Sequence, residues 1–189
     1  MIIVGILGDI GSGKSYVAKQ FGYPVFNADH EVNKIYKKNK ICFRKIKRKL
    51  PKYIKSFPIS KIELMNAILG NTTNLKKITQ IIHPLVRKEM NLFFLKNKKK
   101  KIVVLDIPLL LENKLKKKKM VLVFVQSKKS DILRRLTKRK NFNKKILKKF
   151  KSIQFPLDYK KNKSQFIIKN DFNKKTVKKQ ISYILKKVL

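Results

Sequence analysis

The stretch IIVGILGDIGSGKSYVAK, residues 2–19, decides the fold of this chain. It holds four of the six glycines among 189 residues, all within the first thirteen positions. The apolar run at 2–7 is typical of a buried parallel strand, and residues 14–21 are typical of a helix that ends at Gly22. Glycines concentrated between a strand and a helix indicate a turn in which side chains would obstruct the backbone path or a bound group.

The turn matches the P-loop pattern G-x-x-x-x-G-K-S over residues 8–15, in the strand-to-helix context that this pattern requires. In a P-loop, backbone N–H groups and a helix N-terminus surround the phosphates of a nucleotide. Lys14 is expected to reach the β- and γ-phosphates, and the Ser15 hydroxyl is expected to bind Mg²⁺. The residues expected to bind the nucleotide in this loop are Asp9, Ile10, Gly11, Ser12, Gly13, Lys14, Ser15 and Tyr16.

Length and composition limit the class of protein. A chain of 189 residues with 43% hydrophobic residues is long enough for one domain with a sizeable core. No apolar run approaches the roughly 18 residues that a membrane-spanning helix needs. The start lacks the features of a secretory signal, and Cys42 is the only cysteine, so no internal disulfide forms. We therefore expect a cytoplasmic protein without a membrane partner.

The net charge of +40 has two readings. Clustered basic side chains would indicate nucleic-acid binding. However, Arg occurs at only six positions, whereas interfaces that read bases rely on Arg, and Lys is spread along the chain as AT-rich codons would produce. We expect no specific nucleic-acid partner, only incidental binding of polyanions. Because the chain has only ten acidic residues, an acid at a chemically useful position carries extra weight.

Apolar runs alternate with helical patterns along the rest of the chain. Residues 40–58 are expected to form short helices and turns, and Pro84 is expected either in the first turn of a long helix or at a kink in it. The alternation predicts an α/β fold with a parallel five-stranded sheet flanked by helices. The further strands are expected at 24–29, 101–108, 120–126 and 165–170. The further helices are expected at 30–39, 60–69 with a capping box at Ser60 and Glu63, 74–97, 129–139, 143–154 and 173–189.

The P-loop alone leaves several enzyme classes open, because GTPases, motor ATPases and small-molecule kinases share it. A GTPase is disfavoured because the chain has no Asn-Lys-x-Asp motif for reading guanine: NKKI at 143–146 lacks the Asp. The chain is also short for a motor ATPase. A small kinase remains.

Further segments carry a resemblance to a known family: NADHEV at 27–32, IIHPLVRKE at 81–89, LDIPLLLEN at 105–113, LRRLTKRK at 133–140, Gln154, and FIIKN at 166–170. Together with the P-loop, and in this order, they resemble the dephospho-CoA kinases over essentially the full chain. The resemblance implies transfer of the γ-phosphoryl group of ATP, with Mg²⁺, to the ribose 3′-hydroxyl of dephospho-CoA by a monomeric enzyme.

The resemblance also implies how the chain is divided. A P-loop kinase core is expected over 1–29, 101–133 and 164–189, within a single domain. A helical region at about 30–100 is expected to hold the acceptor substrate. A lid at about 134–160 is expected to close over ATP.

The resemblance assigns catalytic roles beyond the P-loop lysine. Asp29 matches the second acid of an Asp-Ala-Asp motif and is expected to take or orient the proton of the attacking hydroxyl; a cap of helix 30–39 is the alternative. Arg139 is expected to contact phosphate from the lid, with Arg135 one helical turn earlier; a solvated helix face is the alternative, and for Arg135 it is equally open. Asp106, at the end of a strand, is expected to hold Mg²⁺ with Ser15, although a capping role is equally open.

The acceptor side and the base of ATP have expected contacts too. His83, Pro108, Leu109 and Glu112 match motif positions on the acceptor side. The alternative for His83 is a cap of the long helix, and the alternative for Pro108 and Leu109 is a structural turn. Glu112 has either a positional role or a contact to the substrate region. Asn170 follows the last strand, where the adenine is expected, and an ordinary loop Asn is the alternative.

Several positions depart from the family pattern. The departures are Leu7 and Tyr16 in place of Thr or Ser, Asp9 in place of Gly, Asn27 in place of the first acid, Lys160 in place of Arg, and Asp171 in place of Gly. The Asp9 charge would repel ATP unless it points to solvent or to a Lys. Three readings stay open: an active dephospho-CoA kinase, another small P-loop kinase such as a nucleoside monophosphate kinase, or a degraded P-loop protein that binds polyanions.

Overall fold

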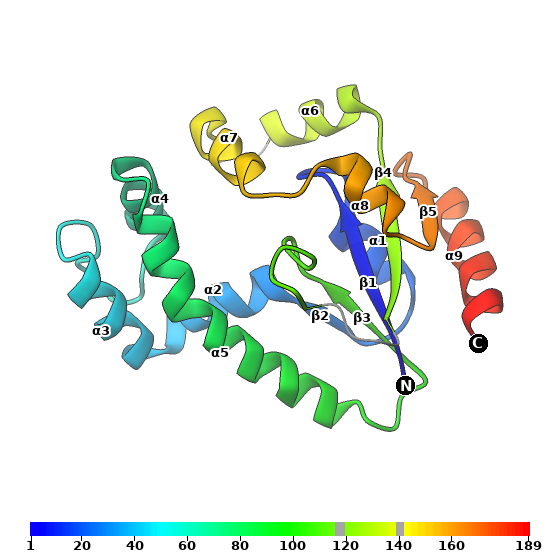
Figure 1. Ribbon diagram of the computed structural model, residues 1–189, viewed down its shortest axis with the longest axis horizontal. Helices are drawn as coiled ribbons and strands as arrows, with labels where there is room; N and C mark the ends of the chain where they lie inside the picture. The colour runs from blue at the N-terminus through cyan, green and yellow to red at the C-terminus, as the bar shows by residue number, and fades with distance from the viewer. Residues whose placement is uncertain (116–119, 139–141) are drawn as a thin grey trace. The chain divides into compact units, whose positions relative to one another are not determined.

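The centre of the fold is a parallel sheet with strand order β2-β3-β1-β4-β5. This confirms the predicted α/β architecture and the five strands, within the part of the chain that the structure describes. The structure is a computed structural model that describes residues 1–115, 120–138 and 142–189 (Figure 1). The strands are β1 (Ile2–Gly8), β2 (Val25–Asn27), β3 (Ile102–Asp106), β4 (Met120–Gln126) and β5 (Phe166–Lys169).

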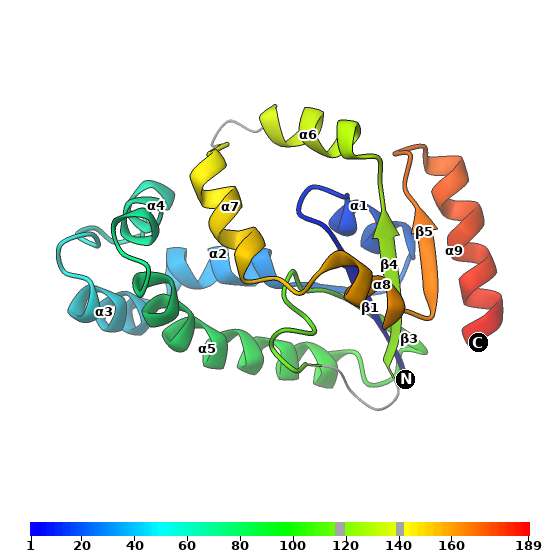
Figure 2. The same ribbon diagram turned by 45° about the horizontal axis from the view of Figure 1, so that its top comes forward.

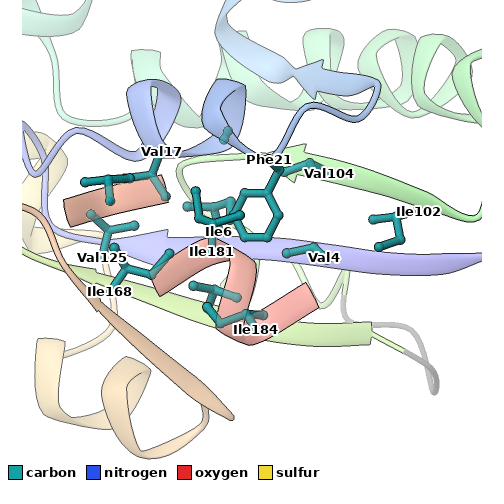
Figure 3. Close-up of a cluster of buried hydrophobic side chains, with 13 residues drawn as sticks. Val4, Ile6, Val17, Phe21, Ile102, Val104, Val125, Ile168, Ile181 and Ile184 are labelled. Atoms are coloured by element: carbon teal, nitrogen blue, oxygen red, sulfur yellow. The ribbon is translucent and has the colours of Figure 1, made fainter. Parts of the chain in front are cut away.

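One face of the sheet is covered by α1 (Lys14–Gln20) and α9 (Lys174–Val188). Figure 3 shows Val17 of α1 and Phe21 at the end of this helix, and Ile181 and Ile184 of α9, directed onto the strands. The strands supply β-branched residues there, which suit a sheet buried on both faces. The strand residues in this cluster are Val4, Ile6, Ile102, Val104, Val123, Val125 and Ile168.

The opposite face of β1 is covered by α8 (Leu157–Asn162) and by the turn that follows β3. Both Figure 1 and Figure 2 show α8 lying over β1. Gly5 leaves room there, because a Cβ at this position would lie 2.7 Å from Leu110 Cδ2. The sequence did not predict α8, because six residues are too short to display a helical period. The helix α6 (Lys129–Thr137) follows β4.

The chain divides into two units, of which the sheet belongs to the first (Met1–Asn27, Asn97–Phe142 and Lys151–Leu189). The second unit contains Ala28–Lys96 and Asn143–Phe150. The expected division into core, acceptor region and lid stays a prediction. No helix in the described ranges is both long enough and apolar enough to cross a membrane.

The second unit is built from helices around its own apolar core. Ile146 and Phe150 of α7 pack against this core, whose members include Cys42, Ile46 and Ile82. Its helices are α2 (Ala28–Lys38), α3 (Lys40–Lys49), α4 (Lys61–Gly70), α5 (Asn74–Lys96) and the first residues of α7 (Lys144–Ser152).

Pro84 lies well inside α5, which begins at Asn74, so of its two expected places the first turn is wrong. Its ring has no N–H to donate to the carbonyl of Gln80, and the helix continues through this missing bond.

The predicted capping box of α4 is confirmed. The Ser60 hydroxyl accepts from Glu63 N at 3.1 Å, and the Glu63 carboxylate accepts from Ser60 N at 3.1 Å. Burial acts to raise the pKa of Glu63, but hydrogen bonds from Lys55, Ser60 and Ser56 outweigh it and lower this pKa. Glu63 thereby connects the preceding loop to the start of the helix.

Replacing Ser60 with Ala is expected to lower the free energy of unfolding by about 1 kcal/mol, because the N3 amide loses its side-chain acceptor. For a chain of this length the Tm should fall by about 2–4 °C. Thermal unfolding of Ser60→Ala measures this, with Lys61→Ala as the control because this exposed residue opens the same helix without capping it. Equal Tm values for the two variants would show that the cap contributes nothing.

Candidate active site

The carboxyl ends of all the strands meet at one edge of the parallel sheet. In open α/β sheets, this edge is where ligands bind. The phosphate loop follows β1 there, and Asn27 and Asp106 end the neighbouring strands β2 and β3. Asn170 directly follows β5. The fold therefore gathers several of the predicted site residues at this edge.

The phosphate loop depends on glycine at two positions in particular. Gly8 has a φ of 144°, and a Cβ there would lie 2.6 Å from Val125 O in the neighbouring strand. Gly13 has a φ of 88° and is the N-cap of α1. Its Cβ would fall on Asn170 Nδ2 and lie 2.7 Å from Phe172 Cε1. The close packing outside the loop, as well as the turn itself, therefore requires these glycines.

Lys14 folds back over the phosphate loop. Its ammonium donates to Asp9 O at 2.7 Å and to Gly8 O at 3.2 Å. This holds the charge beside the backbone turn that is expected to surround the phosphates. The position is compatible with the predicted reach of Lys14 to a triphosphate.

The carboxylate of Asp9 faces a lysine. Asp9 Oδ2 lies 3.8 Å from Lys151 Nζ, and Asp9 Oδ1 accepts from Ile10 N at 2.7 Å. An ion pair with one half-exposed partner contributes little to stability. It does place a positive charge next to the one acid in the phosphate loop, which reduces the expected repulsion of ATP. The sequence could not single out Lys151, because lysines surround it on both sides.

Asn170 holds the phosphate loop from outside. Its Nδ2 donates to Ser12 O at 2.8 Å, and its Oδ1 accepts from Phe172 N at 3.0 Å. Ser127 supports the same place, since its hydroxyl lies 2.9 Å from Ser12 O and 3.0 Å from Asn170 O. Sequence reasoning missed Ser127, and no motif marks it. The buried side chain of Asn170 is thus hydrogen-bonded to the backbone of the loop.

Phe172 is a second residue that sequence reasoning missed. It adopts a φ of 63°, a left-handed conformation that is uncommon for an aromatic residue. Arg135 Cζ lies 4.0 Å from the centre of its ring, and the Tyr16 ring centre lies 6.4 Å away. This group flanks Gly13, so it forms a wall beside the phosphate loop.

Asp106 and Ser15 are the predicted metal ligands. Asp106 is buried at the end of β3, and its Oδ2 accepts from Asn27 Nδ2 at 2.5 Å. Asn27 stands where the family has an acid, so an amide donor rather than a second negative charge faces Asp106. The described residues contain no group of three or more His, Cys, Asp or Glu that would hold a metal alone. Mg²⁺ bound to a nucleotide needs only one or two protein ligands, so this donor set fits.

Asp29 and His83 belong to the second unit. Helix α2 begins at Ala28, so Asp29 lies in its first turn and the alternative role as N-cap is wrong. His83 lies in α5, where burial and the neighbouring Arg87 lower the pKa of its imidazole. His83 is therefore expected to be neutral at pH 7 and to act as a hydrogen-bonding group.

The turn after β3 carries Pro108, Leu109 and Glu112. The Glu112 carboxylate is occupied by protein groups: Oε1 lies 2.8 Å from Lys160 Nζ and accepts from Phe155 N at 2.9 Å. Of the two roles left open by the sequence, these contacts favour the positional one, which stays a prediction. Arg139 lies outside the described residues, so its role in the lid stays a prediction.

Relatives of known family match the chain along its length. The family model described as dephospho-CoA kinase matches residues 2–176. A dephospho-CoA kinase from Wolbachia sp. subsp. Brugia malayi is 32% identical over 189 residues, covering 97% of this chain and 96% of the relative.

Solved structures share the fold. A crystal structure from Thermus thermophilus superposes with a TM-score of 0.79 at 24% identity, covering 100% of this chain and 98% of that one. A dephospho-CoA kinase from Campylobacter jejuni gives a TM-score of 0.62 at 21% identity, covering 98% and 96%. At these identities the likeness supports the fold.

Gly13→Ala is expected to abolish ATP binding, because the added Cβ collides with Asn170 and Phe172 and displaces the loop. The left-handed backbone adds a strain of about 1–2 kcal/mol. Gly22→Ala is a matched control: its φ is 74°, and a Cβ there has no heavy atom within 4 Å. Calorimetric titration with ATP and thermal unfolding compare the two. Equal ATP affinity would contradict the proposed loop geometry.

Proposed function

Because this chain belongs to the dephospho-CoA kinase family, we propose that it phosphorylates the ribose 3′-hydroxyl of dephospho-CoA with ATP, the last step of coenzyme A biosynthesis. The observation that carries the proposal is the phosphate loop at the end of β1, with Lys14 over the turn and Asp106 at the end of the adjacent strand. A triphosphate and its metal need a donor-rich backbone turn, a cation and a carboxylate in this arrangement.

The P-loop residues bind ATP. The backbone N–H groups of residues 9–15 surround its phosphates, and Lys14 exchanges its carbonyl acceptors for phosphate oxygens as negative charge shifts during transfer. Ser15 and Asp106 would hold Mg²⁺, which neutralises phosphate charge when bound. Asn170 contributes by fixing Ser12, and Tyr16 contributes from the wall beside Gly13.

Asp29 serves as the base in the transfer step. Its carboxylate accepts the proton of the 3′-hydroxyl as a bond forms between this oxygen and the γ-phosphorus. The bond from the γ-phosphorus to the oxygen bridging to the β-phosphorus breaks, and ADP leaves. Arg139 adds a positive charge from the lid.

The acceptor substrate is held by residues that follow β2 and β3 and by α5. Asp29, His83, Pro108 and Leu109 form the acceptor side in this proposal, with His83 as a neutral hydrogen-bonding group. Glu112 contributes by holding the turn after β3 in place and does not contact the acceptor. The buried thiol of Cys42 is compatible with a reducing compartment such as the cytoplasm, and a monomeric state stays a prediction.

A coupled assay of ADP release tests the acceptor. With ATP and Mg²⁺, release is expected with dephospho-CoA and not with AMP, CMP or adenosine, because these three carry a ribose 3′-hydroxyl but lack the rest of the dephospho-CoA molecule. Release with AMP or CMP alone would identify a nucleoside monophosphate kinase. ATP binding without release in any mixture would indicate a degraded P-loop protein, and a salt titration of polyanion binding would then follow.

Asp29→Asn is expected to lower kcat by about 10²- to 10⁴-fold while the affinity for ATP stays unchanged, because only the proton acceptor is lost. Glu31→Gln is the matched control for Asp29→Asn, because Glu31 is an acid in the same helical turn that pairs with Lys34 at 3.6 Å. If Asp29→Asn weakens ATP binding and leaves kcat intact, Asp29 is a structural residue.

Lys14→Ala is expected to abolish turnover through lost charge stabilisation.

A further inference from the structure

Among the described residues of this strongly basic chain, one lysine is buried. The side chain of Lys160 is 1% exposed, and it is the only buried cation among the described residues. Its partner Glu112 is 10% exposed, with 2.8 Å between Lys160 Nζ and Glu112 Oε1. Charges are costly to remove from water unless they are paired, so the buried ammonium of Lys160 requires this partner.

The pair joins two segments that are distant in sequence. Glu112 lies in the turn after β3, whereas Lys160 lies in α8, within the segment 154–160 that follows α7. Two further bonds strengthen the junction: Lys160 Nζ donates to Gln154 Oε1 at 3.0 Å, and Phe155 N donates to Glu112 Oε1 at 2.9 Å. Both ends of the segment 154–160 are thus connected to one side chain, Glu112.

Both segments also lie against β1. Helix α8 packs on this strand, and Leu110 of the turn lies where Gly5 leaves space. The ion pair therefore fastens the turn and the segment 154–160 to each other on the strand that leads into the phosphate loop. A displacement of one is transmitted to the other, because the interior is closely packed.

The second oxygen of Glu112 argues against direct substrate binding. Glu112 Oε2 is buried and has no hydrogen-bond partner among the described residues. Since a buried oxygen is closed to a substrate unless the covering segment moves, and Oε1 already accepts two donors, Glu112 acts through the protein.

We propose that Glu112 and Lys160 are a single positioning unit, which holds Pro108 and Leu109 in place for the acceptor by anchoring them to the segment 154–160. The proposal rests on the function proposed above. It differs from a role of Glu112 as an acceptor ligand. If the two residues act as one unit, replacing either of them must change the same kinetic constant by a similar factor.

Substitutions of Lys160 can test the pair, because an ammonium and a guanidinium bond differently to a carboxylate. An ammonium is a point charge and here reaches one carboxylate oxygen, whereas a guanidinium donates from a planar fork to both oxygens. Lys160→Arg is therefore expected to supply the donor that Glu112 Oε2 lacks. Lys160→Met keeps an unbranched side chain that is one atom shorter and removes its charge.

Thermal unfolding of four variants, Lys160→Met, Glu112→Gln, their double variant and Lys160→Arg, tests whether the pair holds the two segments. Lys160→Met leaves a buried carboxylate unpaired and is expected to lower the Tm by about 10 °C. The double variant Glu112→Gln with Lys160→Met is expected to recover most of this loss, because no uncompensated charge remains. Lys160→Arg is expected to match or exceed the wild-type Tm. Additive losses in the double variant would contradict a direct pair.

Kinetics below the lowest Tm test the positioning role. Lys160→Met and Glu112→Gln are each expected to raise the KM for dephospho-CoA about tenfold or more, without changing the KM for ATP, since misplaced contacts weaken acceptor binding. The double variant should be no worse than either single variant, and Lys160→Arg should keep the wild-type KM. Amide hydrogen exchange of Phe155 is expected to accelerate in Glu112→Gln and Lys160→Met.

Three results would overturn the proposal. A raised KM for dephospho-CoA in Glu112→Gln but not in Lys160→Met would identify Glu112 as a direct ligand. Unchanged kinetic constants in both would leave the pair with stability alone. Unchanged exchange at Phe155 would show that the pair does not hold the segment. If wild-type protein fails to phosphorylate dephospho-CoA, the proposed function fails instead, and the Tm and exchange data still decide whether the pair anchors the segment.

Discussion

The site depends on the hydrogen bonds that hold the phosphate loop at Ser12 O. A bare glycine turn has little conformational preference of its own, since glycine adopts many backbone states. Asn170 Nδ2 and the Ser127 hydroxyl both donate to Ser12 O, so the ends of β4 and β5 fix the loop that β1 begins. The parallel order of these strands brings the three segments to one edge. Gly13 is then required because Asn170 and Phe172 occupy the space that a side chain would need.

The departures from the family pattern have partners in the structure. Asp9 faces Lys151, and Asn27 donates to Asp106. Asp171 accepts from the Thr176 hydroxyl and from Asn173 N, bonds that lower the pKa of its carboxyl group and help the chain enter α9. Acids are scarce in this chain, so these contacts are specific uses of rare side chains. They support an enzyme that has adapted to its lysine-rich composition over one that has degraded.

Local patterns predicted the regular elements well and the connections less well. β4 appears at the expected residues, and the capping box starts α4 where Ser60 and Glu63 indicate it. Such signals lie within a few neighbouring residues, so they survive a biased composition. Helix α8 and the left-handed Phe172 were missed, because short elements and single unusual backbone conformations are set by the surfaces they contact. The start of α2 at Ala28 places Asp29 within the first turn of the helix, not at the cap position that was the alternative to its expected role as base.

The sequence by itself determined the phosphate loop, its strand and its helix. The loop requires glycines at fixed spacing followed by Lys14 and Ser15, and this pattern is local and occurs nowhere else in the chain. The tertiary structure alone decided which lysines pair with the acids of the site and of the turn after β3. With lysines along the whole chain, pattern cannot distinguish Lys151 or Lys160 from their neighbours. Only the arrangement of the strands and α8 around β1 places Lys160 out of water beside Glu112, where its charge must be paired.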